Sequence, residues 1–145
     1  MKLKHIIFFL TNSLFLTPFI ASAQTNYYWV GDAGNWSDLN HWATSSGGTT
    51  LHTELPTEND DVFFDENSFT EANQNVILDA NYSCNNLDWS MASGVPRFSS
   101  SSIYNLFING AIVLSDSISV STFLGDFRFL SNEAVNLDFG KNRSF

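Results

Sequence analysis

Acidic side chains gather just after the Pro56–Thr57 turn and form the first group in this sequence that could do chemistry. Calcium takes six to eight oxygen ligands, which a loop rich in Asp, Asn and Glu can supply. The candidate calcium ligands are Asp60, Asp61, Asp65 and Glu66. Phe63 and Phe64 interrupt the cluster, and the spacing Asp-x-Asp-x-Asp-Gly is missing. The alternative is therefore a solvated acidic turn without a metal.

Three tryptophans precede this cluster and offer a second kind of chemistry. Trp29, Trp36 and Trp42, with Tyr27 and Tyr28, could form an aromatic platform on which sugar rings stack. Large aromatic side chains also make major core contributions, with their polar tips hydrogen-bonded. Because β-type sequence follows, we favour a role for the tryptophans in closing the open end of a β core. Carbohydrate binding stays the alternative for the same three residues.

Catalytic constellations are not recognisable in the sequence. The chain lacks a Gly-x-Ser-x-Gly, a His-Glu-x-x-His and a phosphate-binding loop. His41 and His52 stand in turn-like sequence, where packing or surface roles are expected. Cys84 is the single cysteine, so no intrachain disulfide can form, and we expect it to be a small buried residue. The sequence predicts a protein that is not an enzyme and has no cofactor apart from the calcium considered above.

The N-terminus is typical of a secretory signal. Lys2 and Lys4 precede an apolar stretch, and Ala21-Ser22-Ala23 fits a cleavage site, which predicts a mature chain beginning at Gln24. The apolar run is interrupted and too short to span a bilayer. Loss of the two lysines shifts the formal net charge from −9 to −11. Such a charge argues against binding to nucleic acid or anionic membrane surfaces, which needs clustered Lys and Arg.

The rest of the chain alternates apolar and polar residues with period two, and helical patterns are scarce. Short strands are predicted at 75–79, 111–114, 117–121, 127–129 and 135–139. Turns are expected at Gly94-Val95-Pro96, Asn109-Gly110 and Ser131-Asn132. These features predict an all-β fold.

A short pattern, Asn-Leu-x-large-polar, begins at Asn86, Asn105 and Asn136. A short pattern that recurs along the chain at the spacing of these three copies is typical of solenoid coils. We therefore predict a right-handed parallel β-helix. An antiparallel β-sandwich is the alternative, because Asn109-Gly110 between apolar residues is also a strong hairpin signal. In a parallel coil the same dipeptide would instead form the corner that connects one strand to the next.

The segments GNWSDLNHW, LPTENDDVFFDENSFT and NVILDANYSCNNLDW together resemble the N-terminal region of large secreted surface proteins of Bacteroidetes. Those proteins are adhesin-like, carry β-helical or immunoglobulin-like repeats, and often end in a sorting domain for type IX secretion. A looser form of the opening is similar to the start of autotransporter-type β-helices. The match covers Tyr28–Trp89, and no catalytic residue comes with it.

Together these observations predict a signal peptide at 1–23, an aromatic and Gly-rich cap at 24–66, and β-solenoid coils at 67–145. The chain stops just after a predicted strand and has no sorting domain, so we expect a fragment of a larger protein. The expected function is a non-catalytic secreted cell-surface or adhesion module, with extracellular glycans or other surface proteins as partners. The alternative is a secreted β-helix protein that binds or degrades polysaccharide.

Overall fold

The computed structural model describes residues 23–116, 118–131 and 137–138. Within these residues the structure is built from short strands, one 3₁₀ turn at Leu39–His41 and no α-helix, which confirms the all-β prediction. None of the described residues forms a helix long and apolar enough to cross a membrane. The predicted signal peptide lies almost entirely outside the described residues.

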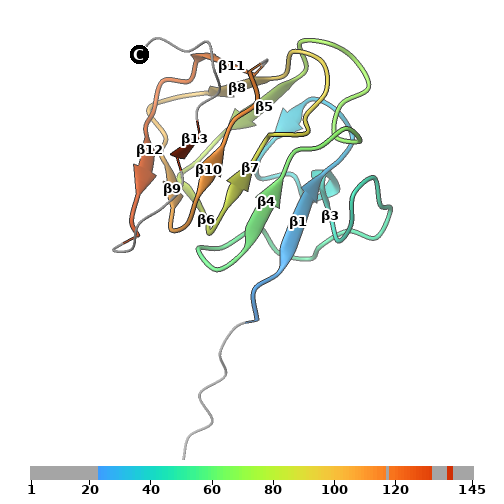
Figure 1. Ribbon diagram of the computed structural model, residues 1–145, viewed down its shortest axis with the longest axis horizontal. Coiled ribbons are helices and arrows are strands. Elements are labelled where there is room, and N and C mark those ends of the chain that lie inside the picture. Colours follow the sequence, from blue (N-terminus) through green and yellow to red (C-terminus); the bar gives the residue numbers. More distant parts are fainter. Residues whose placement is uncertain (1–22, 117, 132–136, 139–145) are drawn as a thin grey trace, which may run out of the picture.

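The strands form three sheets, and Figure 1 shows β10, β7, β4 and β1 of the largest one as a row of adjacent strands. Sheet A contains, in spatial order, β13 (Leu137–Asp138), β10 (Ile112–Val113), β7 (Leu87–Asp88), β4 (Asp61–Phe63), β1 (Asn26–Trp29) and β3 (Trp42–Ala43). Sheet B contains β11 (Ser119–Thr122), β8 (Arg97–Ser100), β5 (Asn75–Leu78) and β2 (Gly34–Asn35). Sheet C contains β12 (Phe127–Phe129), β9 (Leu106–Ile108) and β6 (Tyr82–Cys84).

From β4 onward the chain visits the sheets in the order A, B, C and then returns to A beside its earlier strand. β4, β5 and β6 make the first complete circuit, β7, β8 and β9 the second, and β10, β11 and β12 the third. Of the ten strand pairs in the described residues, nine are parallel and only β1 with β3 is antiparallel. An antiparallel sandwich needs antiparallel neighbours, so that alternative is wrong for the part of the chain described.

The corner between β9 and β10 decides between the two interpretations of Asn109-Gly110. β9 belongs to sheet C and β10 to sheet A, so the dipeptide connects two sheets and does not close a hairpin. A Cβ at Gly110 would lie 2.2 Å from Oδ1 of Asn86 and 3.1 Å from the carbonyl oxygen of Asn85. Glycine is therefore required at this corner by the close approach of the preceding circuit.

The strand predictions are largely confirmed, whereas the repeat was assigned in the wrong register. β12 covers 127–129 as predicted, and β5 and β10 fall within their predicted ranges. Val62, Leu87, Ile112 and Leu137 are consecutive partners in sheet A, with the circuits 25 residues apart. The copy at Asn105 belongs instead to sheet C, where Leu106 pairs with Tyr82 and Phe127. All but two residues of the last copy, Leu137 and Asp138, lie outside the described residues.

The inner faces of the three sheets meet in one continuous core. Alternate residues of β5 and β9 point inward, as the buried positions Val76, Leu78, Leu106 and Ile108 show. Aromatic rings stack along this core between circuits: Phe64 and Trp89 have centroids 3.6 Å apart, and Phe98 and Phe127 5.6 Å apart. The core therefore grows by one layer with each circuit.

Side-chain amides and carboxylates tie the circuits together at the corners. Oδ1 of Asp61 accepts from the backbone N–H of Asn86 at 3.1 Å, and Oδ1 of Asn86 accepts from the N–H of Ala111 at 2.7 Å. A second ladder links Asn81, Asn105 and Asp126 in the same way, at 2.8 and 3.1 Å. Each polar side chain thus satisfies a backbone donor of the next circuit where the strands end.

Cys84 lies on the inner face of β6 and is fully buried, as predicted. Burial, with a smaller effect of the Asp61 carboxylate, raises the pKa of its thiol far above the usual value. A cysteine buried in this way behaves as a small apolar core residue. Tyr82 begins the same strand, and burial together with its bond to Asp79 raises its pKa to about 12.

Candidate functional site

The three predicted sugar-stacking tryptophans are core residues. Trp29, Trp36 and Trp42 are each 0 % exposed. Trp42 meets Trp29 edge-on at 5.0 Å between ring centroids and Trp36 at 4.8 Å, and its Nε1 donates to the carbonyl oxygen of Trp36 at 2.8 Å. These rings present no face to solvent, so a carbohydrate platform made of them is not what the structure contains.

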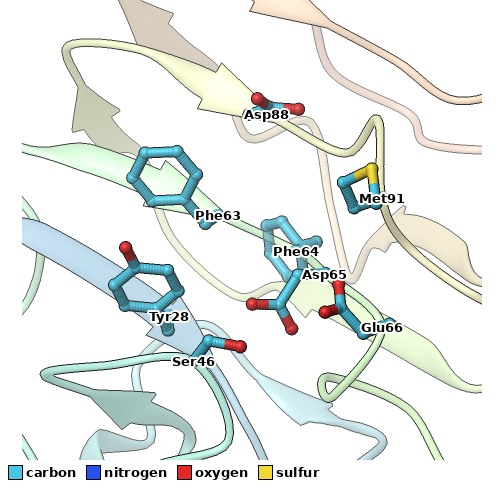
Figure 2. Close-up of a pocket in the computed structure, with 8 residues that line it drawn as sticks. All are labelled: Tyr28, Ser46, Phe63, Phe64, Asp65, Glu66, Asp88 and Met91. Atoms are coloured by element: carbon cyan, nitrogen blue, oxygen red, sulfur yellow. The ribbon is translucent and has the colours of Figure 1, made fainter.

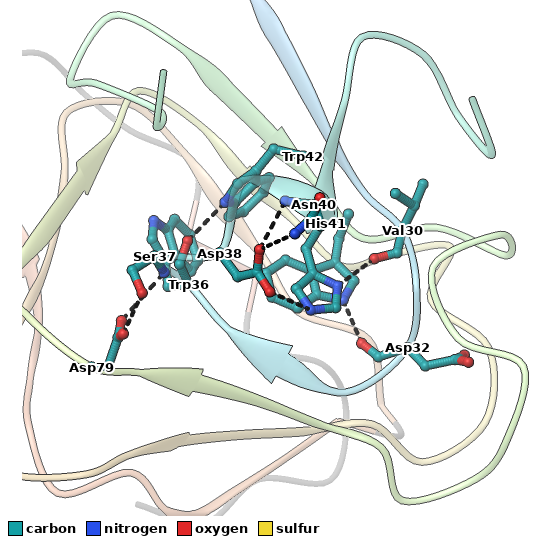
Figure 3. A network of polar contacts seen from close by, with 10 residues as sticks. Val30, Asp32, Trp36, Ser37, Asp38, Asn40, His41, Trp42 and Asp79 are labelled. Carbon is teal, nitrogen blue, oxygen red and sulfur yellow. Dashed lines mark hydrogen bonds and ion pairs between the residues drawn. The ribbon is translucent and has the colours of Figure 1, made fainter. Parts of the chain in front are cut away.

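His41 belongs to the same packed end of the molecule (Figure 3). Its ring lies parallel to that of Trp29 at 4.4 Å, and its Nδ1 donates to the carbonyl oxygen of Val30 at 2.6 Å. Nε2 lies 3.9 Å from the Asp38 carboxylate. His41 thereby packs β1 against the 3₁₀ turn.

The four predicted calcium ligands divide into two separate pairs. Asp60 is buried and accepts from the backbone N–H and hydroxyl of Thr57 at 2.9 and 2.6 Å, so it fixes the turn before β4. Asp61 accepts from Asn85 and Asn86 in the corner ladder. Asp65 and Glu66 follow the other end of β4. Among the described residues no three His, Cys, Asp or Glu side chains come together in a group able to hold a metal ion.

Two other aromatic residues of these strands do reach the surface. Tyr28 in β1 and Phe63 in β4 are partners in sheet A and point to its outer face. Their rings stack at 5.0 Å between centroids with 18° between planes. Both are half-buried, so part of each ring remains open to solvent. We call Tyr28 and Phe63 the outer aromatic pair.

A concavity of about 400 Å³ lies over the outer aromatic pair (Figure 2). Three carboxylates line it together with the two rings. Asp88 is the partner of Phe63 on β7, so two rings and a carboxylate form one row across three adjacent strands. The remaining lining residues are Ser46, Phe64, Asp65, Glu66 and Met91.

Short turns hold two of these carboxylates in place. Asp65 accepts from the backbone N–H of Asn67 at 2.9 Å, and Asp88 accepts from the N–H of Ser90 at 2.7 Å. Met91 at the rim is 64 % exposed and has a flexible thioether chain that adapts to different contacts. The site thus combines fixed acidic groups, a rigid ring pair and one adaptable apolar side chain.

No Lys or Arg lines this pocket in the part of the chain that the structure describes. The described arginines are engaged elsewhere: Arg97 donates to Asn73 at 3.3 Å, and Arg128 pairs with Asp126 at 3.4 Å. Neither lines the concavity. The three carboxylates therefore face it without a described counter-ion.

Sequence reasoning placed only part of this site. Tyr28 was included in the predicted aromatic platform, and Asp65 and Glu66 were considered as metal ligands. Phe63, Asp88 and Met91 were not identified as site residues. The signal for Phe63 was present, because alternation through Val62-Phe63-Phe64 requires that one phenylalanine point outward when the other is in the core. Asp88 could be assigned to the site only from the pairing of β4 with β7, which places it beside Phe63.

Comparison of the chain with protein-family models, with curated proteins and with solved structures gives no match. The pocket geometry therefore carries the functional argument.

Proposed function

We propose that this protein is a secreted, non-catalytic cell-surface or adhesion module that binds its partner through the outer face of sheet A. The pocket over the outer aromatic pair is the observation that carries this proposal. Interaction sites are enriched in aromatic side chains and in Met, and a partly open ring pair beside fixed polar groups has that composition. The resemblance of Tyr28–Trp89 to adhesin-like surface proteins of Bacteroidetes is consistent with this role.

The scaffold we propose is a right-handed parallel β-helix. Three observations support it: parallel pairing between circuits, the fixed order of the sheets, and the polar ladders at the corners. In such a scaffold the buried tryptophans close the N-terminal end of the core, and β3 runs antiparallel beyond β1. Successive circuits then display outward residues in straight rows, which suits an extended binding surface.

A second candidate is the binding of polysaccharide at the same pocket. Aromatic faces stack on the apolar faces of sugar rings, and carboxylates accept hydrogen bonds from sugar hydroxyls. The row of Tyr28, Phe63 and Asp88 offers both kinds of group on adjacent strands. Both candidates use the same residues, so one set of variants tests them.

The test is a binding profile of the secreted full chain on arrays of oligosaccharides and of synthetic peptides that cover acidic, neutral and basic sequences. Wild type should retain at least one probe class, and Tyr28→Ala/Phe63→Ala should lose it. Ile103→Ala is the matched control, because Ile103 is 76 % exposed and lies outside the pocket. Identical profiles for wild type and the double variant would refute binding at this face.

A further inference from the structure

We infer that the pocket over the outer aromatic pair binds a cationic side chain, best an arginine guanidinium, of a basic partner polypeptide. This inference rests on the proposed function and specifies the chemistry of the partner. Its basis is the combination of a stacked ring pair, three carboxylates and a concavity of suitable size, all on one sheet face.

Charge is the first argument for a cationic occupant. Asp65, Glu66 and Asp88 all line the pocket, and no described Lys or Arg does. The whole chain carries a formal net charge of −9. Three carboxylates that face one concavity repel each other, and a bound cation relieves that repulsion. An anionic ligand would add to it.

The rings supply the second argument. A cation within about 6 Å of an aromatic ring centroid is attracted by the electrons of the ring face. Phe63 lies between the ring of Tyr28 and the carboxylate of Asp88 in the row across sheet A (Figure 2). A planar group placed beside Phe63 can therefore contact a ring face and reach an acidic oxygen at the same time.

Arginine fits this combination better than lysine does. Its guanidinium stacks flat on aromatic rings and donates two parallel hydrogen bonds to a carboxylate, whereas an ammonium acts as a compact point charge. The volume of about 400 Å³ lies at the small end of the range for ligand pockets, which suits one long side chain. Met91, exposed at the rim, can cover the aliphatic part of that side chain.

The test measures binding of hexa-arginine to the full chain by isothermal titration calorimetry, with hexa-citrulline as the uncharged isostere and hexalysine as a second cation. Hexa-arginine should bind more tightly than hexalysine, and hexa-citrulline should bind at least tenfold more weakly than hexa-arginine. Phe63→Leu keeps an apolar side chain without a ring face, and it should weaken hexa-arginine binding roughly fivefold. Thermal unfolding of each variant checks that the fold is retained.

Matched charge variants separate the pocket from the general acidity of the chain. Glu66→Gln and Asp88→Asn should each weaken hexa-arginine binding by roughly threefold or more. Glu58→Gln makes the same change in net charge at an exposed site outside the pocket and should leave binding within about twofold. Equal losses in Glu66→Gln and Glu58→Gln would show non-specific attraction and overturn the inference.

The remaining outcomes distinguish this inference from the proposed function. Binding of a neutral oligosaccharide that is lost in Phe63→Ala would overturn the cationic partner and leave the binding face in place. Equal binding of hexa-arginine and hexa-citrulline would also overturn it. If Tyr28→Ala and Phe63→Ala change the binding of no probe, the binding face itself is refuted.

Discussion

The two faces of β1 and β4 carry the same kind of side chain in opposite environments. Inside, Trp29 and Phe64 are buried and pack in a cluster of rings at varied angles. Outside, Tyr28 and Phe63 stack in parallel and remain partly open. Each outer ring is one residue away in sequence from an inner one. The bulkiest aromatics of the region are therefore the least accessible to a ligand.

This difference separates stability from recognition along one pair of strands. Burying an aromatic side chain contributes to folding roughly in proportion to the apolar area removed from water, so the inner cluster should dominate stability. A half-buried pair contributes less to folding and keeps surface available for a partner. The clearest test of this separation is to truncate one ring on each face and to measure both the free energy of unfolding and the binding of a partner.

The largest effect is expected for Trp42→Ala. Trp42 is 0 % exposed and contacts both other buried tryptophans of the N-terminal end, so truncation leaves a large cavity. We expect a loss of about 3–5 kcal/mol in the free energy of unfolding, the usual range for Trp→Ala in a core. Urea unfolding monitored by circular dichroism measures it.

Trp36→Ala provides a second measurement of the same cluster. Trp36 is equally buried but its Nε1 has no hydrogen-bond partner in the structure. Its removal therefore costs packing without breaking a side-chain hydrogen bond, and the loss should fall at the lower end of the same range. Midpoints unchanged by both substitutions would show that the inner cluster does not support the fold.

Gly34→Ala should have the next largest effect, because it tests how rigidly the inner end is packed. A Cβ at Gly34 would lie 2.0 Å from Nε2 of His41, and His41 is held against Trp29 and bonded to Val30. We expect a loss of about 1–3 kcal/mol from overpacking. The double variant Gly34→Ala/His41→Ala should lose less than the sum of the two single changes, as a double-mutant cycle will show. Strict additivity would mean that the cost of Gly34→Ala does not arise from contact with His41.

Asn86→Ala tests the corner between β6 and β7, where side chains link successive circuits. It removes the acceptor for the N–H of Ala111 and the Nδ2 donor to Asp61. Leaving a part-buried donor unpaired costs about 1–2 kcal/mol, measured again by urea unfolding. Asn59→Ala is the control, since Asn59 is exposed and lies in the turn before β4. Equal effects of the two substitutions would show that the polar ladder does not contribute to stability.

The strands were predictable from the sequence because alternation is a local property. The same locality explains the error in the repeat. All three sheets use the same two-residue alternation, so a five-residue match cannot tell whether Leu106 belongs with Leu87 or with Tyr82. The true partners of Leu87, which are Val62 and Ile112, share only apolar character with it. The site depends on pairing across strands, and for that reason Asp88 could not be assigned to it from sequence.

The smallest effect on stability, and the sharpest test of the comparison, is expected for Phe63→Ala. Phe63 stacks on Tyr28 at the outer face, and only part of its ring is buried. Loss of this cross-strand pair should cost about 0.5–1 kcal/mol, against the several kcal/mol expected for Trp42→Ala. Binding of hexa-arginine should show the reverse order, with a large loss in Phe63→Ala and little change in a Trp36→Ala protein that is still folded at the assay temperature. If Phe63→Ala destabilised the protein as much as Trp42→Ala does, the outer aromatic pair would belong to the core. The assignment of stability to the inner face and of binding to the outer face would then be wrong.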